Sequence, residues 1–84
     1  ILYEREFQNL SNAQINFLNV LCDGIQNNFT SNEVIQKYKL GSSSNVVRIM
    51  NALENKEVID RFTSKTEFVD PVFELWLKKR VHQS

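Results

Sequence analysis

Residues 43–56 constrain the fold of this chain more than any other stretch, because they have the pattern of a helix with two unlike faces. At about 100° per residue, apolar and polar side chains separate onto opposite sides of such a helix. The apolar side carries Val46, Ile49, Met50 and Leu53, and the polar side carries Ser44, Arg48, Asn51 and Asn55. Other parts of the chain must therefore cover one face, and the other face is left to solvent or to a partner.

Two further helices are predicted before this one. Ser11 is a good N-cap, and the apolar spacing after it predicts a helix over about residues 11–27. A capping box from Thr30 to Glu33 then predicts the start of a short helix over about residues 31–38.

A hairpin and a last helix are predicted after it. Two short runs rich in β-branched and aromatic residues flank the polar turn at 63–65 and predict an antiparallel hairpin near residues 58–69. Asp70 is a good cap for a final helix over about residues 71–80, where Pro71 occupies the first position without loss of a hydrogen bond.

Helix, short helix, helix, hairpin and helix is the order of a winged helix-turn-helix, in which the hairpin is the wing. The predicted fold class is therefore mainly α with a small β-hairpin. We expect residues 1–10 to be the end of a preceding helix, residues 11–80 to form the winged-helix domain, and residues 81–84 to be a tail. The chain begins with Ile1 rather than Met, so we expect it to be part of a longer protein.

The predicted core joins the apolar sides of these elements. We expect it to contain Leu18, Leu21, Ile35, Val46, Met50, Leu53 and Ile59. Cys22 lies on the apolar stripe of its helix, so we interpret it as a small core residue rather than as a nucleophile.

Composition argues against most kinds of chemistry in this chain. The only cysteine excludes an internal disulfide, and the only histidine, His82, lies two residues from the end. There is no metal-ligand spacing and no GxxxxGK[ST] phosphate loop. We therefore expect no catalytic residue, no metal site and no cofactor-binding residue here. Without a signal peptide or an apolar run of roughly 18 residues, a cytoplasmic setting away from membranes is expected.

The outer face of the helix at 43–56 and the predicted wing supply the candidates for DNA contact. Hydroxyl and backbone N–H groups at a helix N-terminus can hold a phosphate, while Arg suits guanine and Asn suits adenine. The candidates are Ser43, Ser44, Asn45, Arg48, Asn51, Arg61 and Lys65. A nucleic-acid binder usually has a basic excess, whereas this chain has ten cationic and ten acidic residues. A capped helix with a solvated outer face is the alternative interpretation.

Apolar side chains on the first and last helices suggest a second surface. The last helix spreads its apolar residues over more than one face, and a small domain has a single core to cover them. The predicted docking surface consists of Tyr3, Phe7, Leu75 and Leu77. The alternative is that the first and last helices pack on each other.

The chain also resembles a known family. The stretch "LSNAQINFLNVLC" at 10–22, the stretch "LGSSSNV" at 40–46 and above all "DPVFELW" at 70–76 look like the C-terminal winged-helix domain of AAA-type P-loop ATPases of the archaeal-ATPase kind, found also in bacteria. The resemblance covers about residues 8–80. It implies that ATP and Mg²⁺ bind in an N-terminal domain of the parent protein, so no nucleotide-binding residue is carried onto this chain.

Two functions are therefore predicted. The first is a non-catalytic C-terminal module of a cytoplasmic ATP-binding ATPase, which has the rest of that protein as its partner and contacts DNA weakly. The second is a stand-alone winged-helix transcription regulator that forms a homodimer through its outer helices. The sequence leaves the choice between them open.

Overall fold

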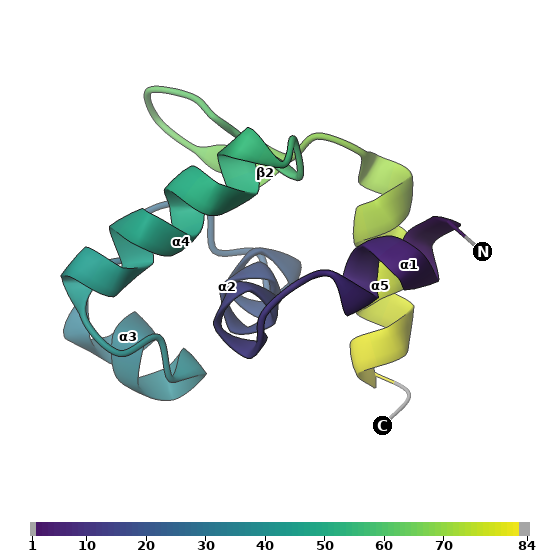
Figure 1. Ribbon diagram of the computed structural model, residues 1–84. Helices are drawn as coiled ribbons and strands as arrows, with labels where there is room; N and C mark the ends of the chain where they lie inside the picture. The colour runs from purple at the N-terminus through teal and green to yellow at the C-terminus, as the bar shows by residue number, and fades with distance from the viewer. Residues whose placement is uncertain (1, 83–84) are drawn as a thin grey trace.

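The computed structural model describes residues 2–82, in which five helices and two strands follow one another along the chain. They are α1 (Leu2–Gln8), α2 (Asn12–Cys22), α3 (Asn32–Tyr38), α4 (Ser43–Asn55), β1 (Ile59–Arg61), β2 (Thr66–Phe68) and α5 (Pro71–His82). Figure 1 shows α2 at the centre, with α3 and α4 on one side and α5 with α1 on the other. The fold is a winged helix-turn-helix, as the sequence predicts.

The central helix α2 begins where the sequence predicts. The Ser11 hydroxyl accepts a hydrogen bond from the backbone N–H of Gln14, and the Gln14 side chain accepts one from the backbone N–H of Ser11. The predicted extension to residue 27 is wrong, because the helix ends at Cys22. Gly24 has a φ of 90°, a left-handed conformation that glycine adopts readily and that ends a helix.

The start of α3 differs from the prediction by one residue. The Thr30–Glu33 capping box is wrong, since the N-cap is Ser31, whose Oγ accepts a hydrogen bond from the backbone N–H of Val34 at 3.3 Å. The Ser31 backbone is extended, as an N-cap requires. The hydroxyl of Ser31 therefore accepts the capping hydrogen bond that was expected for Thr30. The helix ends at Tyr38, and its C-cap, Lys39, takes a left-handed conformation that leads into the turn before α4.

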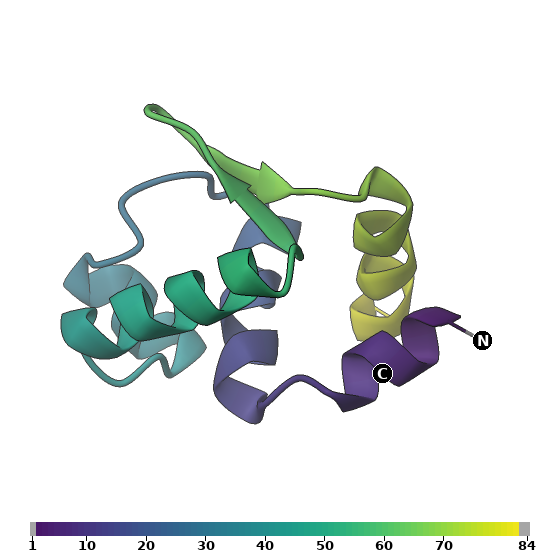
Figure 2. The same cartoon turned by 45° about the horizontal axis from the view of Figure 1, so that its top comes forward.

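The hairpin forms the predicted wing. Its two strands pair antiparallel, with Ile59 opposite Phe68 and Asp60 opposite Glu67. Because successive side chains of a strand point to opposite faces, the acidic pair lies on the face away from the core. The backbone N–H of Thr66 donates to the carbonyl oxygen of Gln26 at 2.9 Å, so the wing is joined to the loop after α2. Figure 2 shows the wing projecting above α4, with this loop beside it.

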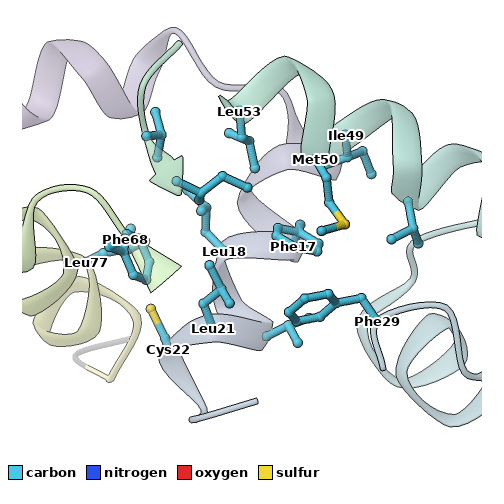
Figure 3. Packing of buried hydrophobic residues seen from close by; sticks show 14 of the residues in the cluster. Phe17, Leu18, Leu21, Cys22, Phe29, Ile49, Met50, Leu53, Phe68 and Leu77 are labelled. Atoms are coloured by element: carbon cyan, nitrogen blue, oxygen red, sulfur yellow. The ribbon is translucent and has the colours of Figure 1, made fainter. Parts of the chain in front are cut away.

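The core is built around α2, as Figure 3 shows. Six of the seven predicted core residues are buried, namely Leu18, Leu21, Val46, Met50, Leu53 and Ile59. Ile35 is only partly buried, so this prediction is wrong, because α3 lies at the edge of the domain and contributes no fully buried residue. The prediction also missed Phe17 and Val20, both 0% exposed, because α2 is covered on more than the one predicted side.

The last helix is longer than predicted. Helix α5 continues to His82, two residues beyond the predicted end, and the remaining residues of the predicted tail, 83–84, lie outside the described residues. Within residues 2–82, no helix has the length and apolar character needed to cross a membrane.

Candidate nucleic-acid interface

The N-terminus of α4 presents two of the predicted phosphate contacts to solvent. Ser42, rather than Ser43 or Ser44, caps the helix, because its Oγ accepts a hydrogen bond from the backbone N–H of Asn45 at 3.2 Å. Ser43 and Ser44 are exposed, and their hydroxyls have no hydrogen-bond partner within residues 2–82. Both hydroxyls are therefore available to a ligand.

Asn45 instead supports the turn between α3 and α4. Its side-chain nitrogen donates to the carbonyl oxygen of Leu40 at 2.7 Å and so closes the turn from the inside. Gly41 has a φ of 94°, and a Cβ built there would lie 3.4 Å from the same nitrogen of Asn45. The amide nitrogen of this predicted DNA contact is thus engaged by the backbone.

Arg61 of the wing contacts the outer face of α4. Its Nη1 donates to Oδ1 of Asn51 at 2.9 Å and lies 3.7 Å from Oε1 of Glu54. Two of the predicted DNA-contacting residues, one on the wing and one on α4, are therefore brought together but bind each other. The carboxylate of Glu54 lowers the positive potential that Arg61 offers to a phosphate.

The other cations of this face differ in their availability. Lys65 Nζ lies 3.4 Å from Oε2 of Glu67. Lys56 Nζ donates to the carbonyl oxygen of Asn9 and to Oε1 of Gln14. Arg48 is exposed and has no ion-pair or hydrogen-bond partner within the described part of the chain. Arg48 is thus the cation of this face that is most available to a phosphate.

The predicted docking surface is largely used within the domain. The Tyr3 hydroxyl donates to Oδ2 of Asp70 at 3.0 Å, a hydrogen bond that raises the pKa of Tyr3. The Phe7 ring lies 5.8 Å from that of Trp76, and the Arg80 guanidinium lies 4.5 Å from the Phe7 ring. The alternative from the sequence, that the first and last helices pack on each other, is therefore confirmed for this pair of helices.

Two residues of that surface behave differently from each other. Leu77 is 0% exposed, so its assignment to a docking surface is wrong, because this side of α5 faces α2 and completes the core. Leu75 is 57% exposed and lies on the outer side of α5 with Val72, which is equally exposed. Val72 and Leu75 lie one helical turn apart on the same side of α5 and form an apolar strip, and we refer to it by that name below.

The cysteine is a core residue, as predicted. Cys22 is buried, and burial raises the pKa of its thiol to about 11. Because the thiolate is the reactive form, this thiol is poorly nucleophilic near neutral pH. Within residues 2–82 no group of three or more His, Cys, Asp and Glu residues is placed to hold a metal.

Phe62, at the tip of the wing, was not among the predicted site residues, although Lys65 of the same turn was. Phe62 is 52% exposed there, and it borders a hollow of about 190 Å³ that the wing shares with the loop after α2. An aromatic residue directly before the polar turn at 63–65 is visible in the sequence, and this position could have predicted its exposure. Asn27 and Asn28 also line the hollow, but nothing in the sequence predicts this, because only the fold brings their loop next to the wing.

Comparison with known proteins identifies one relationship. A family model described as a probable winged helix domain matches residues 1–79 of the chain, which include α1, the wing and most of α5. No curated protein and no solved structure matches the chain.

Proposed function

This chain belongs to the family of probable winged helix domains, and from that premise we propose that it is a non-catalytic module of a larger AAA-type ATPase. In this proposal the module docks on the rest of its protein and contacts duplex DNA only weakly. ATP and Mg²⁺ bind in another domain of that protein, and no residue of this chain is assigned to them.

The proposal of weak DNA contact rests on how many cations of α4 and the wing are already engaged by other side chains. Duplex DNA is bound largely through several Lys and Arg contacts to phosphates, each of which releases counterions. Here Arg61 is bound to Asn51 and lies beside Glu54, and Lys65 lies beside Glu67, so of these three cations Arg48 alone has no partner within residues 2–82. One available cation supports weak contact rather than a dedicated DNA-reading function.

The apolar strip supports docking. Val72 and Leu75 are each 57% exposed, whereas Phe73 and Leu77 of the same helix are buried in the core. Apolar side chains gathered on one surface favour contact with another protein surface. We propose that this strip faces the rest of the parent protein. The ATPase character of that parent is supported by the resemblance of the segment 70–76 and of the turn at 40–46.

The reading frame that encodes the chain tests the parent most directly. We expect it to encode a GxxxxGK[ST] loop and an acidic Mg²⁺-binding residue a few hundred residues upstream, by the general design of P-loop ATPases. The 84-residue chain itself should hydrolyse no ATP. An upstream region without a phosphate loop would contradict the proposal and favour the stand-alone regulator.

A double variant, Val72→Ser with Leu75→Ser, tests docking in the longer protein. Both side chains are more than half exposed, so the module should keep its fold while the contact with the rest of the protein weakens. Limited proteolysis between the module and its neighbour should become faster. The matched control is Val47→Ser on α4, which is also exposed and should leave the cleavage rate unchanged. Equal cleavage rates in all three proteins would contradict docking through this strip.

A further inference from the structure

We propose that the tip of the wing and the loop after α2 form a binding site for an unpaired nucleobase of a single-stranded nucleic acid. The site is the hollow of about 190 Å³ that lies between these two segments. One wall is the wing, with Phe62 at its tip, and the opposite wall is the loop at 26–28. This binding activity goes beyond the weak duplex contact proposed above.

Phe62 supplies a stacking surface. Phe62 is 52% exposed although it is large and apolar, and within residues 2–82 it takes no part in a contact between aromatic rings. The backbone N–H of Phe62 donates to the carbonyl oxygen of Lys65 at 2.8 Å, so the hairpin turn holds the base of the side chain in place. An exposed aromatic ring on a fixed backbone can stack on any base, because every base has a π-face.

The loop supplies hydrogen-bonding groups. The side-chain amides of Gln26, Asn27 and Asn28 have no hydrogen-bond partner within residues 2–82. The backbone beneath them is held in place, since the carbonyl oxygen of Gln26 accepts from Thr66 and that of Asn28 accepts from Ser31. An amide carries both donors and an acceptor, which are the groups that pair with the edge of a base.

The charges around the hollow favour a polynucleotide. Arg61 and Lys65 line it, so two cations lie where the phosphates that flank a bound base would run. The acidic residues Asp60 and Glu67 do not line it, because they oppose each other on the other face of the hairpin. Glu54 lies 3.7 Å from Arg61 and Glu67 lies 3.4 Å from Lys65, and both carboxylates weaken the contribution of these cations, so stacking on Phe62 provides most of the affinity.

The site selects an unpaired base over a duplex. In a duplex both faces of a base are covered by its neighbours, and its pairing edge is already hydrogen-bonded. Neither the ring of Phe62 nor the amides of the loop can then reach their partner groups. An unpaired base presents both a free face and a free edge, as single strands and loops do.

Fluorescence anisotropy with a labelled dT₁₂ single strand, compared with a duplex of the same length, tests the site. The parent chain should bind the single strand more tightly than the duplex. Phe62→Leu keeps an apolar side chain without the aromatic face and should weaken single-strand binding by roughly fivefold or more, given the measured worth of one base–aromatic stack. Phe62→Tyr keeps the ring and should bind like the parent.

Two control variants separate this site from the α4 face. Val47→Ala truncates an exposed apolar side chain on α4 and should leave single-strand binding unchanged. Arg48→Ala should weaken duplex binding and leave the single strand nearly unaffected. In NMR spectra, addition of dT₁₂ should shift the side-chain amide signals of Gln26, Asn27 and Asn28.

The proposal is overturned if Phe62→Leu binds the single strand as the parent does, if the parent prefers the duplex, or if the three amide signals do not shift. These outcomes are distinct from a failure of the proposed function. Tight duplex binding through α4 would overturn the proposed function. The wing site is tested separately, by the effect of Phe62→Leu on the binding of single strands.

Discussion

The guanidinium of Arg61 donates a hydrogen bond to the side-chain oxygen of Asn51 at 2.9 Å, and this contact joins the wing to the outer face of α4. The sequence predicts both residues as DNA contacts, but this hydrogen bond engages one guanidinium nitrogen and the side-chain oxygen of Asn51. The carboxylate of Glu54 lies 3.7 Å from the same guanidinium nitrogen. The domain thus keeps the geometry of a DNA-reading fold while its charges are balanced within the protein.

Glu54→Gln should strengthen binding to duplex DNA. The change removes the negative charge beside Arg61, so the guanidinium becomes more available to a phosphate. The slope of log affinity against log salt should steepen by about one, as for one added phosphate contact. Glu4→Gln on α1 is the control, because it changes the net charge equally and also frees an arginine, Arg80, but Glu4 lies beside α5 rather than beside α4 or the wing. If both variants raised the affinity equally, net charge rather than Arg61 would be responsible.

Leu53→Ala should destabilise the domain severely. Leu53 is 0% exposed, and truncation of a fully buried leucine typically costs about 2–5 kcal/mol. Val47→Ala on the same helix is the control, because Val47 is 46% exposed and its loss should change the free energy of unfolding by no more than about 0.5 kcal/mol. Urea unfolding measures both. Equal unfolding midpoints for the two variants would show that α4 faces the core differently.

The stability of the domain should depend on Tyr38 at alkaline pH. The Tyr38 hydroxyl donates to the Asp23 carboxylate, and this hydrogen bond raises the pKa of Tyr38 to about 12 from its ordinary 10.0. Folding therefore favours the neutral phenol, so the stabilisation is fully present below pH 10 and is lost as the pH rises towards 12. The parent should exceed Tyr38→Phe in stability at pH 8, and the difference should shrink above pH 10. A difference that is the same at pH 8 and pH 12 would contradict this.

Arg80→Gln should loosen α1. The Arg80 guanidinium lies over the rings of Phe7 and Trp76, and its Nη1 lies 2.9 Å from Oε2 of Glu4. The side chains are partly exposed, so we expect a loss of about 1 kcal/mol or less in the docking of α1. Backbone amides of α1 should exchange hydrogen faster, and the fluorescence of Trp76 should change. The control is Lys79→Gln, a neighbouring exposed cation, and an equal effect of both variants would show that the contact with Phe7 contributes nothing.

The periodic and capping signals predicted most of the fold, because they act locally. The apolar face of α4 and the cap at Ser11 were readable from the sequence, and both are confirmed. The choice between Thr30 and Ser31 as the cap of α3 was not, since both hydroxyls suit the role and the backbone conformation decides. The burial of Phe17 and Val20 was missed for another reason: it depends on how many elements surround α2, and no local pattern states that.

The candidate site was only partly predictable. The sequence places Arg48 and Asn51 on the outer face of α4, and the structure confirms that both are exposed there. It does not state that Arg61, ten residues further on, reaches back to Asn51, because that contact depends on the path of the hairpin. The same holds for Leu77: its apolar character was clear, but the side of α5 that meets α2 follows only from tertiary packing.

Titration of labelled duplex DNA with the 84-residue chain at physiological salt tests the central claim most directly. We predict a dissociation constant no tighter than roughly micromolar, as for non-specific contact through few phosphates. The affinity should fall as salt is added, and Arg48→Ala should weaken it further because Arg48 has no partner within the described residues. Nanomolar binding that prefers one sequence would contradict the claim that the charges of α4 and the wing are balanced within the protein, and would favour a DNA-binding regulator.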